Sequence, residues 1–134
     1  MIPKFISDKL NQLVLFDMDG VLAEYIAGEE LLIESETKGI YLNKRPIKSV
    51  LSVAEQLNEM VNVEVGVLSS CDFPSQVLEK KEWLCKYLPF IKDENIHIVV
   101  WTNEKYTKET RCVAKLDKIK KMSGFDNIFM SIFN

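Results

Sequence analysis

The sequence is poor in residues that staple small folds or bind soft metals. It has three cysteines and one histidine, and no two cysteines form a C-x-x-C pair. An odd, widely spaced set of cysteines is not a disulfide framework and is typical of a reducing compartment, so we predict a cytoplasmic location. A single histidine with scattered cysteines also argues against a zinc site.

Long hydrophobic runs and an excess of positive charge are missing as well. No stretch reaches the ~18 apolar residues of a membrane span, and no segment has the pattern of a signal peptide. Lys and Arg number 17 against 20 Asp and Glu, a net charge of -3. We therefore expect no membrane and no general nucleic-acid partner. Small phosphorylated substrates need only a few local cations and remain compatible with this balance.

The composition is that of an ordinary globular protein, with 47% hydrophobic and 28% charged residues among 134. This length predicts one domain over residues 1–134 with a single core. The sequence does not indicate an oligomeric state.

Short apolar runs alternate with helical patterns along the chain. A continuous apolar run at 13–16 predicts a strand buried on both faces, residues 63–68 predict a second buried strand, and residues 96–101 predict a third strand. Helical spacing follows Pro46 and again runs from Pro74 to about Leu88. Residues 104–122 fit a loop followed by a helix, and 127–133 fit either a last strand or an amphipathic tail. The order predicts an α/β fold, a Rossmann-like three-layer sandwich with a mainly parallel sheet.

Polar residues follow these strands at the edge where such sheets bind ligands. Asp17, Ser69 and Thr102 each follow a predicted strand, so we expect them on the same edge. Residues 23–45 lie between the first strand and the first long helix and are too short for a domain. They predict a flap, a hairpin or a short helix beside that edge.

Asp17 and Asp19 are separated by one residue and followed by Gly20. Two carboxylates this close are costly unless a cation lies between them or one is protonated. Mg²⁺ prefers carboxylate oxygens, and glycine permits a backbone turn that other residues resist. A plain turn or strand-end cap is the alternative interpretation of the same four residues.

The stretch Asp17–Ala23, after a four-residue apolar strand, resembles the first motif of the haloacid dehalogenase (HAD) superfamily, and within it the 5'(3')-deoxyribonucleotidase type. The resemblance, which extends over roughly residues 12–106, implies a HAD-like fold in which residues 23–45 form a minimal cap. It also implies Mg²⁺ as the cofactor. By this resemblance Asp17 is the nucleophile that becomes a phospho-aspartate, and Asp19 is the general acid and base.

The later motifs of the family have weaker matches. Val65–Ser70 resembles the second motif, so Ser69 and Ser70 would bind phosphate. The third motif supplies a lysine, and Val99–Lys105 resembles the nucleotidase pattern there, which favours Lys105. Lys80 and Lys81 are alternatives. Lys81 lies close to the apolar stripe of its predicted helix, whereas Lys80, three residues before Trp83, is interpreted as helix packing.

The fourth motif usually adds acids after a further strand, often as Asp-Asp, and this chain contains no Asp-Asp. Asp117 and Asp126 are the only aspartates after the third predicted strand. The predicted metal ligands are therefore Asp17, Asp19 and Asp117, and the weak fourth motif puts the activity in question.

Features of residues 23–45 bear on the substrate. Tyr25 lies where nucleotidases carry an aromatic residue that stacks on the base, although packing beneath the flap is an equal alternative. The acidic group of this segment would disfavour highly anionic substrates at the mouth, although such groups are more often a solvated face; it consists of Glu29, Glu30, Glu34 and Glu36.

The leading hypothesis is thus a Mg²⁺-dependent phosphatase for a small phosphomonoester such as a nucleoside monophosphate. A catalytically weak or inactive domain of the same fold, kept for binding or protein contact, is the alternative. A receiver-like signalling module ranks last, because such domains do not usually carry Asp-x-Asp-Gly after the first strand.

Overall fold

The computed structural model describes residues 10–100 and 108–131. Its helices and strands, in chain order, are β1 (Gln12–Phe16), α2 (Glu29–Glu34), α3 (Lys48–Asn58), β2 (Val63–Cys71), α4 (Pro74–Tyr87), the 3-10 helix η1 (Asp93–Asn95), β3 (Ile96–Val100), α5 (Lys108–Met122) and β4 (Asn127–Ser131).

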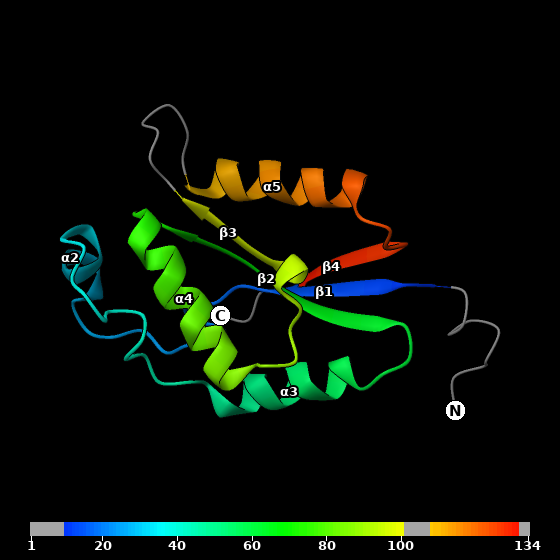
Figure 1. Cartoon of the computed structure of the whole chain (residues 1–134), viewed down its shortest axis with the longest axis horizontal. Helices are drawn as coiled ribbons and strands as arrows, with labels where there is room; N and C mark the ends of the chain where they lie inside the picture. Colours follow the sequence, from blue (N-terminus) through cyan, green and yellow to red (C-terminus); the bar gives the residue numbers. More distant parts are fainter. Residues whose placement is uncertain (1–9, 101–107, 132–134) are drawn as a thin grey trace.

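The four strands form one parallel sheet in the order β3-β2-β1-β4. Helices α3 and α4 cover one face of the sheet and α5 covers the other (Figure 1). The predicted α/β, Rossmann-like three-layer architecture is confirmed. The segment near the C-terminus, for which the sequence left two alternatives, is strand β4.

Strand β1 lies in the middle of the sheet and is buried on both faces. Val14 and Phe16 pack toward α3 and α4, whereas Leu13 and Leu15 pack toward α5. Burial on both sides explains why the strand is a continuous apolar run rather than an alternating one. The charged residue that follows it, Asp17, is thereby placed at the carboxyl edge of the sheet.

Two predicted boundaries differ from the structure. Strand β2 continues to Cys71, because its last five residues, Val67–Cys71, pair with β3. Ser69 and Ser70 consequently lie within the strand instead of following it. Pro46 does not open the helix but pairs with Ala23 in an isolated bridge, and α3 begins at Lys48.

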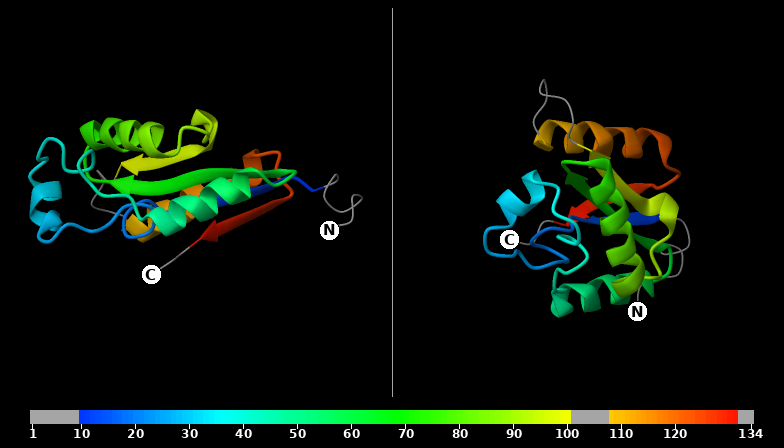
Figure 2. Two further views of the ribbon diagram at one scale, coloured as in Figure 1. Left: turned by 90° about the horizontal axis from the view of Figure 1, so that it is seen from below. Right: turned by 60° about the vertical axis from the view of Figure 1, so that its left-hand side comes forward.

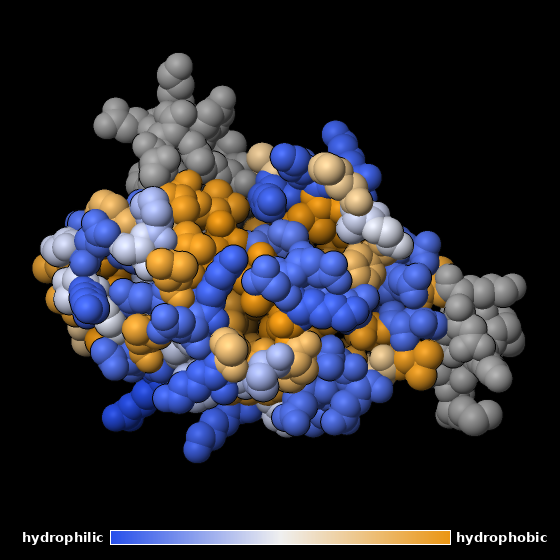
Figure 3. Space-filling view, in the orientation of Figure 1, coloured by the Kyte–Doolittle hydropathy of each residue, from blue (hydrophilic) through white to orange (hydrophobic). Residues whose placement is uncertain are grey.

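Residues 23–45 form the short helix α2 and a series of turns beyond the carboxyl ends of the strands (Figure 2). A small apolar cluster around Ile40, Tyr41 and Cys71 packs this segment onto the sheet. The surface over α3 and α4 mixes hydrophilic and hydrophobic residues (Figure 3). In the described ranges, no helix has the length and hydrophobicity needed to cross a membrane.

Candidate functional site

A tight turn follows β1 and brings the two aspartates together. The carbonyl of Met18 accepts the amides of Val21, Leu22 and Ala23 at 3.3, 2.9 and 2.9 Å. Gly20 has φ 77°, and a Cβ there would lie 2.5 Å from the ring of Tyr25. Its positive φ therefore favours glycine at this position, and a larger residue would also displace the ring of Tyr25.

Asp17 is largely buried but has no ion pair with any described residue. One carboxylate oxygen, Oδ1, accepts the amide of Met18 at 2.7 Å. Burial raises the pKa of Asp17, and the nearby charge of Asp19 raises it further. A carboxylate in this condition is the place where an external cation would be most favourable.

Asp19 is held by two lysines from different parts of the chain. Oδ1 lies 2.9 Å from Nζ of Lys44, and Oδ2 lies 2.8 Å from Nζ of Lys80. Both lysine side chains are 0% exposed, against 22% for Asp19. Burial alone would raise the pKa of Asp19, but Lys80 and Lys44 outweigh it and lower the pKa below its usual value.

Lys80 on α4 connects the first predicted motif to the second. Besides Asp19, its ammonium group donates to Oγ of Ser69 at 2.7 Å and to the carbonyl of Ser70 at 2.7 Å. These three acceptors use all three of its hydrogens. The structure thus brings together the predicted residues Asp19, Ser69 and Ser70 around a lysine that sequence reasoning had interpreted as packing.

Lys44 comes from residues 23–45 and links them to the site. Its ammonium group also donates to Glu29 Oε2 at 2.9 Å. Burial alone would lower the pKa of Lys44, but Asp19 and Glu29 outweigh it and raise the pKa, so the group stays charged. The ring of Tyr41 lies beneath both cations, with its centroid 5.3 Å from Lys44 Nζ and 4.5 Å from Lys80 Nζ.

The segment that carries Lys44 is fastened to α4 by several hydrogen bonds. Glu79 accepts the amides of Gly39 and Tyr41, each at 3.1 Å. The indole of Trp83 donates to the carbonyl of Lys44 at 2.9 Å. The segment is therefore a fixed wall of the site.

Sequence reasoning named Lys80 only as an alternative to Lys105 and interpreted it as helix packing. It missed Lys44 and the ion pair between Lys44 and Glu29. In the structure Lys80 lies in the buried stripe of α4, together with Gln76, Trp83 and Leu84. Lys81, the residue placed close to that stripe, is instead 43% exposed and lies 3.7 Å from Asp93 on the surface.

Lys44 lies in an irregular segment, and we find no sequence pattern that marks it. Glu29 is buried, which corrects its interpretation as part of a solvated acidic face. That interpretation holds for Glu30, Glu34 and Glu36, which are exposed.

Tyr25 lies at the mouth of the site and is 69% exposed. Its ring lies over Gly20, and its centroid is 5.5 Å from Nζ of Lys44. Burial, Asp19 and Asp17 together raise the pKa of its hydroxyl. The alternative in which Tyr25 packs beneath the flap is not what the structure shows.

The remaining predicted residues do not join this group. Thr102 and Lys105 lie outside the described residues. Asp117 was predicted to be a metal ligand together with Asp17 and Asp19. In the structure it is exposed on α5, on the other face of the sheet, and does not join them. Asp126 precedes β4 and accepts the amide of Asn11 at 2.8 Å, at the amino edge. Within the described ranges, no group of three or more His, Cys, Asp or Glu could hold a metal.

Comparisons with known proteins show a likeness in fold to solved structures. No family model matches the chain, and no curated protein matches it. A chain in a solved structure described as "Structure of Pnkp1/Rnl/Hen1 complex" is similar, with a TM-score of 0.60 and 14% identity. The match covers 92% of this chain and 38% of that chain. At this identity the likeness shows the fold alone.

Proposed function

We propose that this domain is a HAD-type, Mg²⁺-dependent phosphohydrolase that acts on small phosphomonoesters through a phospho-aspartate on Asp17. The observation that carries the proposal is the contrast between two neighbouring carboxylates. Asp17 is unpaired among the described residues and its pKa is raised, whereas Asp19 is held by two buried lysines and its pKa is lowered. Environments that separate the properties of two nearby acids are typical of catalytic sites.

Asp17 is the nucleophile in this proposal. One of its oxygens bonds to phosphorus while the bond from phosphorus to the ester oxygen breaks, and that ester oxygen takes a proton from Asp19. In the second step Asp19 accepts a proton from water, the water oxygen bonds to phosphorus, and the bond to Asp17 breaks. Inorganic phosphate is released and both aspartates return to their starting state.

Lys80 has to exchange some of its hydrogen-bond acceptors during this cycle. In the free protein its three hydrogens are taken by Asp19, Ser69 and the Ser70 carbonyl. A bound phosphoryl group competes for them as a stronger acceptor. When Lys80 turns toward phosphate, Asp19 loses one of the two cations that lower its pKa. Asp19 then takes up one proton from solvent as the substrate binds, passes it to the leaving oxygen, regains one from the attacking water, and returns it to solvent when phosphate leaves and Lys80 turns back.

The donor set fits Mg²⁺ through Asp17. Its carboxylate has no ion pair with a described residue, while both oxygens of Asp19 already bind lysines. Asp17 would therefore hold the ion with substrate and water oxygens. When bound, Mg²⁺ would neutralise negative charge on the phosphoryl group.

The substrate proposed is a nucleoside monophosphate or a similar ester with a flat leaving group. Tyr25 supports this, because its exposed ring adjoins the turn that carries both aspartates. Stacking of one base on an aromatic ring contributes about 1–3 kcal/mol. Cys71 and Cys85 are both free thiols, which suits the cytoplasmic location that completes the proposal.

A catalytically weak domain used for binding is the second candidate. Two observations favour it: the charges of Asp19, Lys44 and Lys80 satisfy one another without a ligand, and no third acid joins Asp17 among the described residues. In that case the domain binds phosphate analogues but does not turn over.

Hydrolysis of p-nitrophenyl phosphate and thymidine monophosphate, with and without Mg²⁺, tests the proposal. We expect Mg²⁺-dependent turnover that falls at least about a thousandfold in Asp17→Asn, because the nucleophile is lost. Asp93→Asn is the matched control, since Asp93 forms only a surface ion pair at 3.7 Å. Equal rates in wild type and Asp17→Asn would remove the proposal. Vanadate binding without turnover would favour the second candidate.

A further inference from the structure

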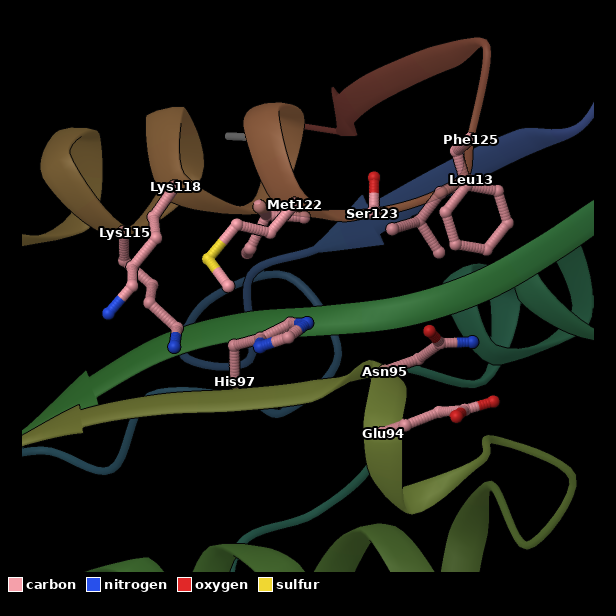
Figure 4. A pocket seen from close by; sticks show the side chains of 10 residues that line it. Leu13, Glu94, Asn95, His97, Lys115, Lys118, Met122, Ser123 and Phe125 are labelled. Carbon is pink, nitrogen blue, oxygen red and sulfur yellow. The ribbon is translucent and has the colours of Figure 1, made fainter.

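A cavity of about 300 Å³ lies on the face of the sheet covered by α5, between that helix and β3 (Figure 4). Its lining comes from β1, η1, β3, α5 and the connection to β4, and it includes none of the residues that surround Asp17. Its volume is within the range of small-molecule sites, which begins at roughly 300 Å³.

One side of this cavity is positively charged. Lys115 and Lys118 are three residues apart on α5, so they share a face of the helix. Both extend toward β3, on the side where His97 lies (Figure 4). Neither lysine has an ion pair with a described residue, and the one acid in the lining is Glu94. Lys115 is half-exposed and Lys118 is exposed, so both ammonium groups are accessible to a ligand from outside.

The state of His97 shows the effect of that charge. Burial lowers the pKa of His97, and Lys115 lowers it further. The imidazole is therefore neutral near pH 7, and Lys118 and Glu94 are the other charged groups that line its cavity. A negatively charged ligand placed among these groups would offset the repulsion between the ammonium groups of Lys115 and Lys118.

The rest of the cavity is apolar, with one polar group that lacks a partner. Leu13 and Ile119 form the buried part of the lining, and the half-buried Phe125 and the exposed Met122 complete it. The hydroxyl of Ser123 is buried without a hydrogen-bond partner within the described part of the chain.

We infer that this cavity binds a small organic anion, with its charged head at Lys115 and Lys118 and its apolar or aromatic body against Leu13, Met122 and Phe125. The inference does not depend on the proposed hydrolase activity, since the two sites share no residue. Carboxylate, sulfonate and phosphate heads meet the same chemical requirement, and the apolar body sets the preference among ligands.

The probe for the test is 1-anilinonaphthalene-8-sulfonate, an anion with an aromatic body. We expect saturable binding at one site of the full chain, at least about tenfold weaker in the double variant Lys115→Met/Lys118→Met. The chain has one histidine, so NMR of its imidazole reports this cavity without ambiguity. Binding should shift the His97 signals and raise the pKa of His97.

The matched control is Lys120→Met/Lys121→Met, which removes the same charge from the same helix at exposed positions outside the cavity. It should bind the probe as wild type does, and circular dichroism checks the fold of each variant. Equal affinity in the two double variants, or His97 signals that do not move, would overturn the inference. Competition by benzoate but not by inorganic phosphate is expected, because only benzoate has an apolar body. Competition by phosphate alone would contradict the role of the apolar lining.

Discussion

The carboxyl edge of the sheet and the face under α5 each place two lysines beside a titratable group, with opposite results. At the edge, Lys44 and Lys80 are fully buried, and both bind Asp19. Under α5, Lys115 and Lys118 reach an open cavity, have no acid partner among the described residues, and adjoin a neutral histidine. The first pair is locked by partners within the chain, whereas the second is open to a partner from outside.

The difference lies in what each lysine contributes to the folded state. A buried charge whose partner is removed is left uncompensated, so the edge cluster depends strongly on every member. An accessible lysine keeps most of its hydration, so its loss changes ligand binding more than stability. Variants at the two places should separate these effects.

The largest effect is expected for Lys80→Met. The change leaves Asp19 with one cation and removes the donor to Ser69, and breaking a buried ion pair in this way costs about 3–5 kcal/mol. Urea denaturation measures the loss against Lys118→Met, which should stay close to wild type. A similar urea midpoint for both variants would show that the buried lysine contributes no more to stability than the accessible one.

Lys44→Met should have the next largest effect, and its cause can be tested by a double-mutant cycle with Glu29→Gln. The single change Lys44→Met leaves Glu29 as a buried charge without its cation, so we expect the free energy of unfolding to fall by about 3 kcal/mol. Adding Glu29→Gln should restore part of this, because the stranded charge is then removed. Additive losses in the double variant would mean that the two groups do not interact.

Asp17→Asn should increase stability at neutral pH while it removes activity. The folded-state pKa of Asp17 is raised above its ordinary value of 3.8, so its contribution is full below that pH and is lost as the pH rises through the folded-state pKa. Asp19 behaves oppositely: its folded-state pKa is lowered, and its contribution is lost as the pH falls through that value. Urea midpoints from acid to neutral pH should therefore diverge for Asp17→Asn and Asp19→Asn. Parallel profiles would contradict the contrast between the two carboxylates.

The smallest effect is expected for Lys115→Met in the absence of ligand. Removing this charge should raise the pKa of His97, because Lys115 is the charge that lowers it, and should leave stability nearly unchanged. An NMR titration of the single imidazole measures the shift, with Lys120→Met as the control. An unchanged titration would place Lys115 too far from His97 to influence it.

Much of the fold could be predicted from local pattern. Strand β1 contains a continuous apolar run, β2 and β3 are rich in valine and isoleucine, and α4 begins at a proline and ends before another. Such features depend on neighbouring residues only. The β2 boundary was wrong because the pairing of Cys71 with Val100 is a long-range contact, and no local feature marks it.

The site was predictable only where the residues lie next to a strand. Asp17, Asp19 and Ser69 were found because the edge of the sheet is implied by the strands. Lys80 reaches Asp19 across 61 positions of sequence, and a lysine on an apolar helix face is equally compatible with a side chain that extends to solvent. Lys44 and Glu29 meet across an irregular segment whose path no periodicity defines.

The hydrogen bond from Trp83 to the carbonyl of Lys44 has a practical consequence. It places a buried indole where α4 contacts residues 23–45, the segment beyond the carboxyl edge of the sheet. Indole emission depends on polarity and on hydrogen bonding of its N–H group, so release of that segment would redden and quench the signal. With Trp101, the second tryptophan, changed to Phe, Trp83 would be a native optical reporter of whether this wall stays attached to α4.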